Sequence, residues 1–321
     1  MLVKTLKTNK PSAFISFFAV SFCLFIFDLI ASLPVQIESN HPIFSSLLIF
    51  FSTNAWLSYT LVFILGLLIA MGWNNLLTDR GVFKNITILP AFILLLLSSA
   101  FEISAIWGSY FLMLFVLNKL MSIYQKSKPY TALFDSGFLI GLSATIYPVS
   151  ILFFFLIIVA VFIYSTMNWR HFLIPLLGLL TPLLFIFTYG YYFDVLIDLG
   201  EYYFNFFSFA LPLFKWTTSL VIWSSVLGIL FLLSFKEMVD WLAMKNLRSR
   251  KAFYLFFAYS ACVFISLFFT AFDWNHLLLF GLPMSVLIAN YFMFLHKKWW
   301  YEGAFIVLIL STIYLHIETL F

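Results

Sequence analysis

Long apolar runs dominate the chain, and short polar stretches separate them. The runs 61–71, 153–164 and 220–235 contain no charged side chain. A strand of a transmembrane barrel alternates apolar and polar residues over ~10 positions, whereas these runs are continuous. A membrane-crossing helix needs ~20 mostly apolar residues. The pattern therefore predicts an all-α, polytopic integral membrane protein.

Dividing the chain at its polar breaks gives about eleven transmembrane helices. The apolar stretch 43–54 follows Pro42 and is interrupted by serines, which favours a short helix lying at the interface over a twelfth crossing. The expected spans are 13–34, 55–75, 87–101, 104–122, 132–147, 149–166, 172–192, 217–235, 252–271, 277–295 and 303–320.

Composition excludes the soluble classes of protein. Of the 321 residues, 64% are hydrophobic and 9% are charged, whereas an ordinary soluble domain is about 45–50% apolar and about 25% charged. A chain of this length cannot bury so much apolar surface in water. We therefore expect a single transmembrane domain over 1–321 that contacts the lipid bilayer, with no soluble domain and no nucleic-acid partner.

The basic residues predict the orientation. Cytoplasmic loops are enriched in Lys and Arg, and a cytoplasmic N-terminus places sixteen of the seventeen basic residues on that side, with only Lys215 outside. An inner-membrane location follows. The chain then divides into a cytoplasmic N-terminus (1–12), a first external loop with its interfacial helix (35–54), a large external loop (193–216) and a basic cytoplasmic loop (236–251) that includes a short interfacial helix.

Two carboxylates near the external face are the candidate catalytic groups. Ionisable residues within spans are costly and often functional. Asp28 is expected near the outer end of the first span, and Glu38 in the loop that follows. Such a pair can bind a divalent cation or act as a general base on an acceptor hydroxyl. Alternatively, Asp28 reaches the interface or bonds a neighbouring helix.

Further polar residues are expected on an external surface that receives a substrate, a cation or a partner. The spacing of Asp194, Asp198 and Glu201 places all three on one helical face, although a solvated face without a task also explains it. The turn that begins at Asp273 has the same two interpretations. The surface comprises His41, Asp194, Asp198, Glu201, Lys215 and Asp273.

No metal site is predicted, and the sequence leaves any cofactor unknown. The orientation divides the five histidines between the two sides, and they lack HxxxH or HExxH spacing. A three-histidine external site from His41, His276 and His316 stays formally open. Cys23 and Cys262 lie in apolar spans, where thiols are usually inert.

The fifth span is expected to be central in the bundle. Gly137 and Gly141 form a G-x-x-x-G motif, which lets another helix approach closely. Tyr147-Pro148 then breaks the segment at the outer face.

Several stretches together resemble an uncharacterised family of multi-pass inner-membrane proteins from Bacteroidota. The resemblance covers most of the chain and implies no established activity. It rests on Asn74-Asn75-Leu76-Leu77, Asp79-Arg80-Gly81, Leu89-Pro90-Ala91, the run Phe134-Asp135-Ser136-Gly137-Phe138-Leu139-Ile140-Gly141-Leu142, and Trp169-Arg170.

A more distant likeness is architectural. In C-type glycosyltransferases, which use polyprenyl-phosphate sugars, an acidic residue in the first external loop precedes an interfacial helix, and a Gly-Leu-rich helix follows in mid-chain. Asp28 or Glu38, the segment 43–54 and Gly137–Leu142 occupy those places here. The chain departs from the pattern because it has no adjacent acidic pair in this loop, it is short for the class, and no soluble C-terminal domain is expected.

Two functions remain in competition. The first is a cell-envelope protein with a glycosyltransferase-C-like architecture that handles a polyprenyl-linked sugar or another lipid at the external face. The second is a non-catalytic scaffold or assembly subunit of an envelope complex, whose partners are other membrane proteins. A transporter ranks third, because intramembrane charge is sparse and inverted repeats are absent.

Overall fold

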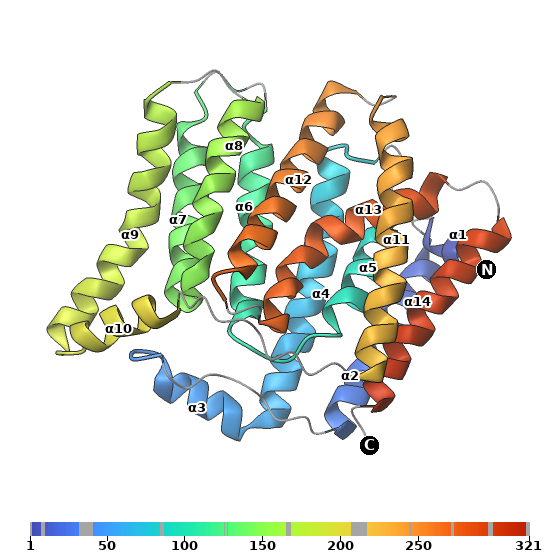
Figure 1. Cartoon of the computed structure of the whole chain (residues 1–321), viewed down its shortest axis with the longest axis horizontal. Coiled ribbons are helices and arrows are strands. Elements are labelled where there is room, and N and C mark those ends of the chain that lie inside the picture. The colour runs from blue at the N-terminus through green and yellow to red at the C-terminus, as the bar shows by residue number, and fades with distance from the viewer. Residues whose placement is uncertain are drawn as a thin grey trace.

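A computed structural model of the chain is built of helices (Figure 1). It describes residues 2–7, 10–31, 41–83, 87–124, 126, 128–164, 168–206, 217–243, 246–270, 273–294 and 298–318. The helices are α1 (Leu2–Leu6), α2 (Pro11–Ala31), α3 (Ser45–Thr53), α4 (Ala55–Asp79), α5 (Leu89–Ser98), α6 (Ile106–Met121), α7 (Tyr130–Ile146), the 3-10 helix η1 (Pro148–Phe153), α8 (Phe154–Tyr164), α9 (Arg170–Tyr192), α10 (Leu196–Phe206), α11 (Thr218–Ala243), α12 (Leu247–Leu267), the 3-10 helix η2 (Trp274–Phe280), α13 (Gly281–Phe294) and α14 (Lys298–Glu318).

The helices have the length and surface of a membrane protein. Within the described part, six helical segments are long and apolar enough to cross a bilayer. Large apolar side chains face outward, among them Phe155, Phe185 and Leu232, which are 61%, 74% and 70% exposed. Such an apolar surface would promote aggregation in water, whereas it is the expected surface of a protein that contacts lipid. The prediction of an all-helical protein with helices long and apolar enough to cross a membrane is confirmed for the described residues.

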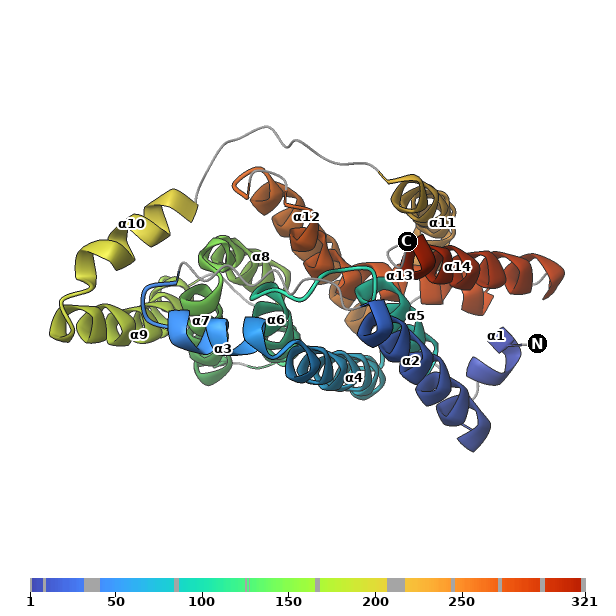
Figure 2. The same cartoon turned by 90° about the horizontal axis from the view of Figure 1, so that it is seen from below.

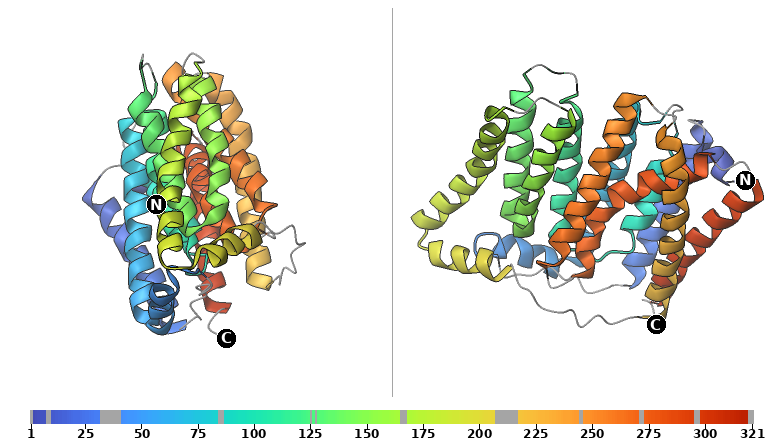
Figure 3. Two further views of the ribbon diagram at one scale, coloured as in Figure 1. Left: turned by 90° about the vertical axis from the view of Figure 1, so that its left-hand side faces the viewer. Right: turned by 45° about the horizontal axis from the view of Figure 1, so that its top comes forward.

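Most of the helices run between the same two ends of the molecule (Figure 3). The C-terminal ends of α6, α8 and α11 and the N-terminal ends of α7, α9 and α12 lie at the upper end in Figure 1, while α3 and α10 lie across the lower end. Seen from below, α10 lies beside α9, and α3 lies near α4, α6 and α7 (Figure 2). The helical segments expected at 43–54 and within 193–216 are therefore both found, as α3 and α10.

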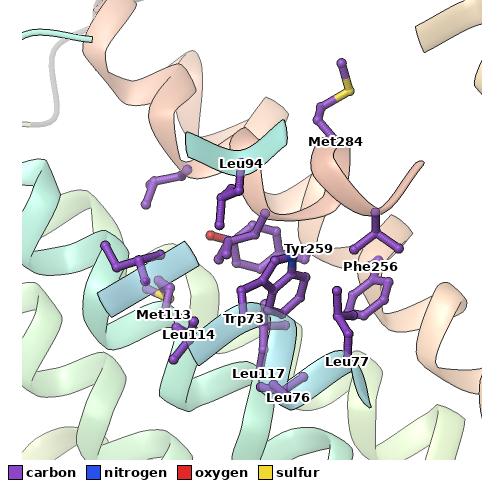
Figure 4. Close-up of a cluster of buried hydrophobic side chains, with 14 of the residues drawn as sticks. Trp73, Leu76, Leu77, Leu94, Met113, Leu114, Leu117, Phe256, Tyr259 and Met284 are labelled. Atoms are coloured by element: carbon purple, nitrogen blue, oxygen red, sulfur yellow. The ribbon is translucent and has the colours of Figure 1, made fainter. Parts of the chain in front are cut away.

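A layer of buried side chains joins α4, α5, α6, α12 and α13. Trp73 lies at its centre, surrounded by Leu94, Met113 and Tyr259 (Figure 4). The Trp73 indole N–H donates to the Ser285 hydroxyl (3.0 Å), and its ring meets Phe256 edge-on at 5.3 Å. Because lipid is as apolar as this core, close packing and buried hydrogen bonds hold these helices together, with little help from the hydrophobic effect.

Helices α7 and α9 pack with their backbones in direct contact, as the glycine motif predicts. A Cβ atom on Gly137 would overlap the Pro175 carbonyl oxygen, and one on Gly141 would overlap the Leu179 carbonyl oxygen. Gly178 of α9 faces the Phe134 carbonyl in the same way. Glycines on both helices are therefore needed for this approach.

The basic segment 236–251 differs from its expected form. Helix α11 continues to Ala243, and α12 begins at Leu247. A short interfacial helix on a cytoplasmic loop was the wrong interpretation of Met238 and Leu242, because both lie within α11. Polar residues such as Lys236 and Glu237 do not end this helix, since both have good helix propensity.

Candidate functional site

The two candidate catalytic carboxylates are only partly within the described structure. Asp28 lies in α2, one turn before the helix ends, and its side chain is outside the described part. Glu38 falls in 32–40 and Lys215 in 207–216, both outside the described residues. Their catalytic and surface roles remain predictions.

The site that the structure does define surrounds the C-terminal end of α7. The last carbonyl groups of a helix lack intrahelical donors, and here Pro148 prevents the helix from continuing. The Tyr203 hydroxyl of α10 donates to the Ala144 carbonyl (3.1 Å), and His41, just before α3, donates to the Thr145 carbonyl (2.9 Å). Both surface helices are therefore attached to the same helix end.

We name this group the α7-end cluster. Its members are polar side chains from six helices, from the α7–η1 junction and from the segment before α3, and all are buried except Tyr203, which is half-buried. They are His41, Ser109, Ser143, Tyr147, Ser150, Tyr203, Ser266 and His276.

His41 is buried and neutral, although the sequence suggested a surface role. Its side chain is 2% exposed, and its Nδ1 accepts from the backbone N–H groups of Ile43 and Phe44 (both 3.2 Å). Nε2 must then carry the proton that it donates to Thr145. Burial lowers the pKa of His41, and the Thr145 carbonyl opposes this only in part. Both nitrogens are engaged, so His41 is not available as a metal ligand in this arrangement.

Tyr203 supplies the matching attachment from α10. Burial raises the pKa of its hydroxyl, which therefore stays protonated and can donate. The neighbouring Tyr202 ring packs against the His41 ring at 4.8 Å between centroids. The segment before α3 and helix α10 therefore contact each other as well as α7.

A hydrogen-bonded chain runs from α7 through η2 to α12. The Ser266 hydroxyl donates to the Val263 carbonyl (2.9 Å), so it must accept from His276 Nε2 (2.7 Å). His276 Nδ1 then accepts from the Tyr147 hydroxyl (2.8 Å). Since the serine accepts from the histidine, this is not an activated serine nucleophile.

Three serines complete the cluster on the α6 side. The Ser109 hydroxyl lies 2.6 Å from that of Ser143 and 2.7 Å from that of Ser150, and all three are fully buried. Sequence reasoning missed them because serines in apolar spans carry no motif. Their only signal is that Ser143 and Ser150 flank the Tyr147-Pro148 break.

The acidic residues lie at the same end but do not form one helical face. Asp198 and Glu201 are exposed on α10, whereas Asp194 lies in the α9–α10 turn with a φ of 57°. The prediction of a common face is wrong for Asp194, because the chain turns before α10 begins. Leu199 anchors the opposite side of α10 and is fully buried against α9 at Gly190.

Asp273 initiates η2. Its carboxylate accepts from the Asn275 backbone N–H (3.1 Å), which is the hydrogen bond of an N-terminal cap. The interpretation of this turn as a structural feature without a task is therefore sufficient to explain the carboxylate, because its hydrogen bond is made within the turn. Three residues on, His276 is fully buried, and it is this residue that joins the α7-end cluster.

The described residues contain no group of three His, Cys, Asp or Glu side chains placed to hold a metal ion. In comparisons with known proteins, the model of a family of unknown function matches residues 30–321. None of the curated proteins and none of the solved structures matches the chain.

Proposed function

The chain belongs to DUF6427, a family of unknown function, and we propose that it handles a polyprenyl-linked sugar, or another lipid, at the external face of the inner membrane. In this proposal it is a multi-pass protein of the cell envelope with an architecture like that of the C-type glycosyltransferases. The observation that carries the proposal is the attachment of α3 and α10 to one end of α7.

Surface helices of this kind lie at the depth of lipid headgroups. His41 and Tyr203 hold α3 and α10 across one end of the bundle, and α10 exposes Asp198 and Glu201 there. Together with Asp194, Asp273 and Lys215, these acids form the proposed rim that receives a substrate or a cation. His41 contributes by holding the segment before α3 in place.

The proposed topology has eleven crossings and a cytoplasmic N-terminus. Six helical segments are long enough to cross, and five shorter apolar segments accompany them. Basic residues support the orientation, because Lys126 and Lys128 lie between α6 and α7 and Arg170 begins α9, all at the end opposite α3 and α10. Cytoplasmic loops carry such an excess of positive charge.

The proposed reaction is transfer of a sugar from a polyprenyl phosphate to an acceptor hydroxyl. Asp28 or Glu38 takes the proton of that hydroxyl, the acceptor oxygen bonds to the anomeric carbon, and the polyprenyl phosphate departs with its electron pair. A carboxylate is a suitable base when it lies within hydrogen-bond reach of the acceptor. Lys215, a bound cation or backbone N–H groups supply the contact to the phosphate.

The test is binding of a polyprenyl phosphate to the purified protein in nanodiscs, measured by native mass spectrometry. The matched polyprenol, which lacks the phosphate, is the control. We expect saturable binding of the phosphate form and none above background for the polyprenol. Equal retention of both would show that only the apolar chain is recognised, and the proposal would fail.

A non-catalytic scaffold is the second candidate, and a different observation favours it. His41, Ser266 and His276 form their hydrogen bonds with other groups of the protein. Groups that are fully satisfied in this way stiffen a structure. Partners would be other envelope membrane proteins that contact the Phe-rich flanks and the basic cytoplasmic connections.

A further inference from the structure

Basic side chains gather at the end of the bundle opposite the α7-end cluster. Arg80 follows the last residue of α4, and Arg248 and Lys251 lie in the first turns of α12. The Ser249 hydroxyl donates to the Gly81 carbonyl (2.9 Å), which joins the two segments directly. We call Arg80, Arg248 and Lys251 the basic cluster.

The fold fixes the position of Arg80. Gly81 has a φ of 64°, which turns the chain sharply after Arg80. The Arg80 guanidinium donates from Nη2 to the Asn118 side-chain oxygen (2.5 Å) and to the Asn118 carbonyl (3.1 Å). Both of these bonds use Nη2, and a guanidinium has N–H donors on its other nitrogens with which a further acceptor can pair.

Aromatic rings line the same place. The Lys251 ammonium lies 5.6 Å from the centre of the Tyr124 ring, and that ring meets Tyr164 edge-on at 6.2 Å. The Tyr164 hydroxyl also lies near Arg80 and Arg248. Residues from the ends of α4, α6 and α8 and from the start of α12 therefore converge.

Positive charge is in excess here. Burial lowers the pKa of Arg80, and the nearby Arg248 lowers it further, while Asp79 opposes both effects. The N-terminus of α12 adds the positive end of its dipole, where cations are unfavourable. By contrast, Lys119 at the same end is neutralised by Asp135 at 2.7 Å. An additional anion would relieve the repulsion between Arg80 and Arg248.

We infer that the basic cluster binds the phosphate headgroup of an anionic phospholipid. Arginine pairs with phosphate through two parallel hydrogen bonds, and basic pockets between transmembrane helices bind such headgroups. A lipid fits better than a free phosphate because Leu247 and Tyr254, 66% and 47% exposed, flank Lys251 on one face of α12. The acyl chains would lie along this apolar face below the headgroup.

The test uses delipidated full-length protein in detergent, with phosphatidylglycerol and phosphatidylcholine as probes. Native mass spectrometry reports the lipid retained. We expect preferential retention of phosphatidylglycerol. The double variant Arg80→Gln, Arg248→Gln should bind this lipid about thirtyfold more weakly, because each charge removed lowers the affinity roughly fivefold. Arg248→Gln alone should show part of this loss and, because Arg248 is exposed, should fold normally.

Lys126→Gln with Lys128→Gln removes the same charge from exposed positions at the same end, and it should leave retention unchanged. An equal loss in this control pair, or equal retention of both lipids by the wild type, would overturn the inference. Inorganic phosphate that displaces phosphatidylglycerol at equal concentration would assign the site to free phosphate. The site lies away from the proposed external face, so its failure would leave the proposed function standing.

Discussion

Gly137→Ala should prevent α7 and α9 from packing and sharply reduce the amount of folded protein. The new Cβ would overlap the Pro175 carbonyl oxygen, which is backbone and cannot rotate away. Adding a methyl group to a packed core typically costs about 1–3 kcal/mol, and a clash with backbone falls at or above the upper end. The measurement is thermal melting, with membrane abundance, of the variant in detergent.

Gly228→Ala is the matched control, because it places the same methyl group on an exposed helical face. A Cβ at Gly228 of α11 meets nothing within 4 Å. We expect a melting temperature equal to that of the wild type, or slightly raised, since Ala favours helix over Gly by up to ~1 kcal/mol. If the melting temperature of Gly137→Ala equalled that of the wild type, the close α7–α9 contact would be wrong.

Asp28→Asn combined with Glu38→Gln should abolish sugar transfer while abundance stays unchanged. The amides have nearly the same shape but cannot act as an anionic base or as a strong cation ligand. A carboxylate in a transmembrane helix costs ~2.5–3.5 kcal/mol near the centre and less near the interface, so neutralising Asp28 should not impair insertion. The measurement is transfer from a polyprenyl-phosphate sugar by purified protein, beside the melting temperature.

A structural role for Asp28 gives the opposite pattern. The melting temperature would fall, and activity would fall only in proportion to the folded protein that remains. Full complementation by the double variant in cells would exclude the catalytic proposal and favour the scaffold. Comparison of the single and double variants also reports whether the two carboxylates act as one unit.

The sequence predicted those features of the fold that depend on local pattern. Continuous apolar runs predicted long apolar helices, because a helix in lipid must satisfy its backbone within one segment, and six such helices are found in the described part. The helices at 45–53 and 196–206 were recognised from polar breaks and from amphipathic spacing. Gly137 and Gly141 identified the close approach of a second helix, although they could not identify α9 as the partner.

The α7-end cluster could not be predicted from the sequence, because it depends on contacts between segments that are far apart in the chain. His276 follows Tyr147 by more than a hundred residues, and each looked like an isolated polar residue. The burial of His41 depends on the Thr145 carbonyl, which no side-chain pattern reveals. The path of the chain at Asp194 depends on a single backbone angle, so the helical spacing was misleading there.

The central claim is that the end of the bundle carrying α3, α10 and the α7-end cluster faces outward. Its most direct test is labelling of single cysteines by a membrane-impermeant maleimide, in a Cys23→Ser, Cys262→Ser background that removes the two native thiols. Asp198→Cys and Lys128→Cys are the reporters, since both residues are exposed and they belong to opposite ends. We predict labelling of position 198 in intact cells and of position 128 only after permeabilisation; the reverse order, or labelling of both from one side, would contradict the account.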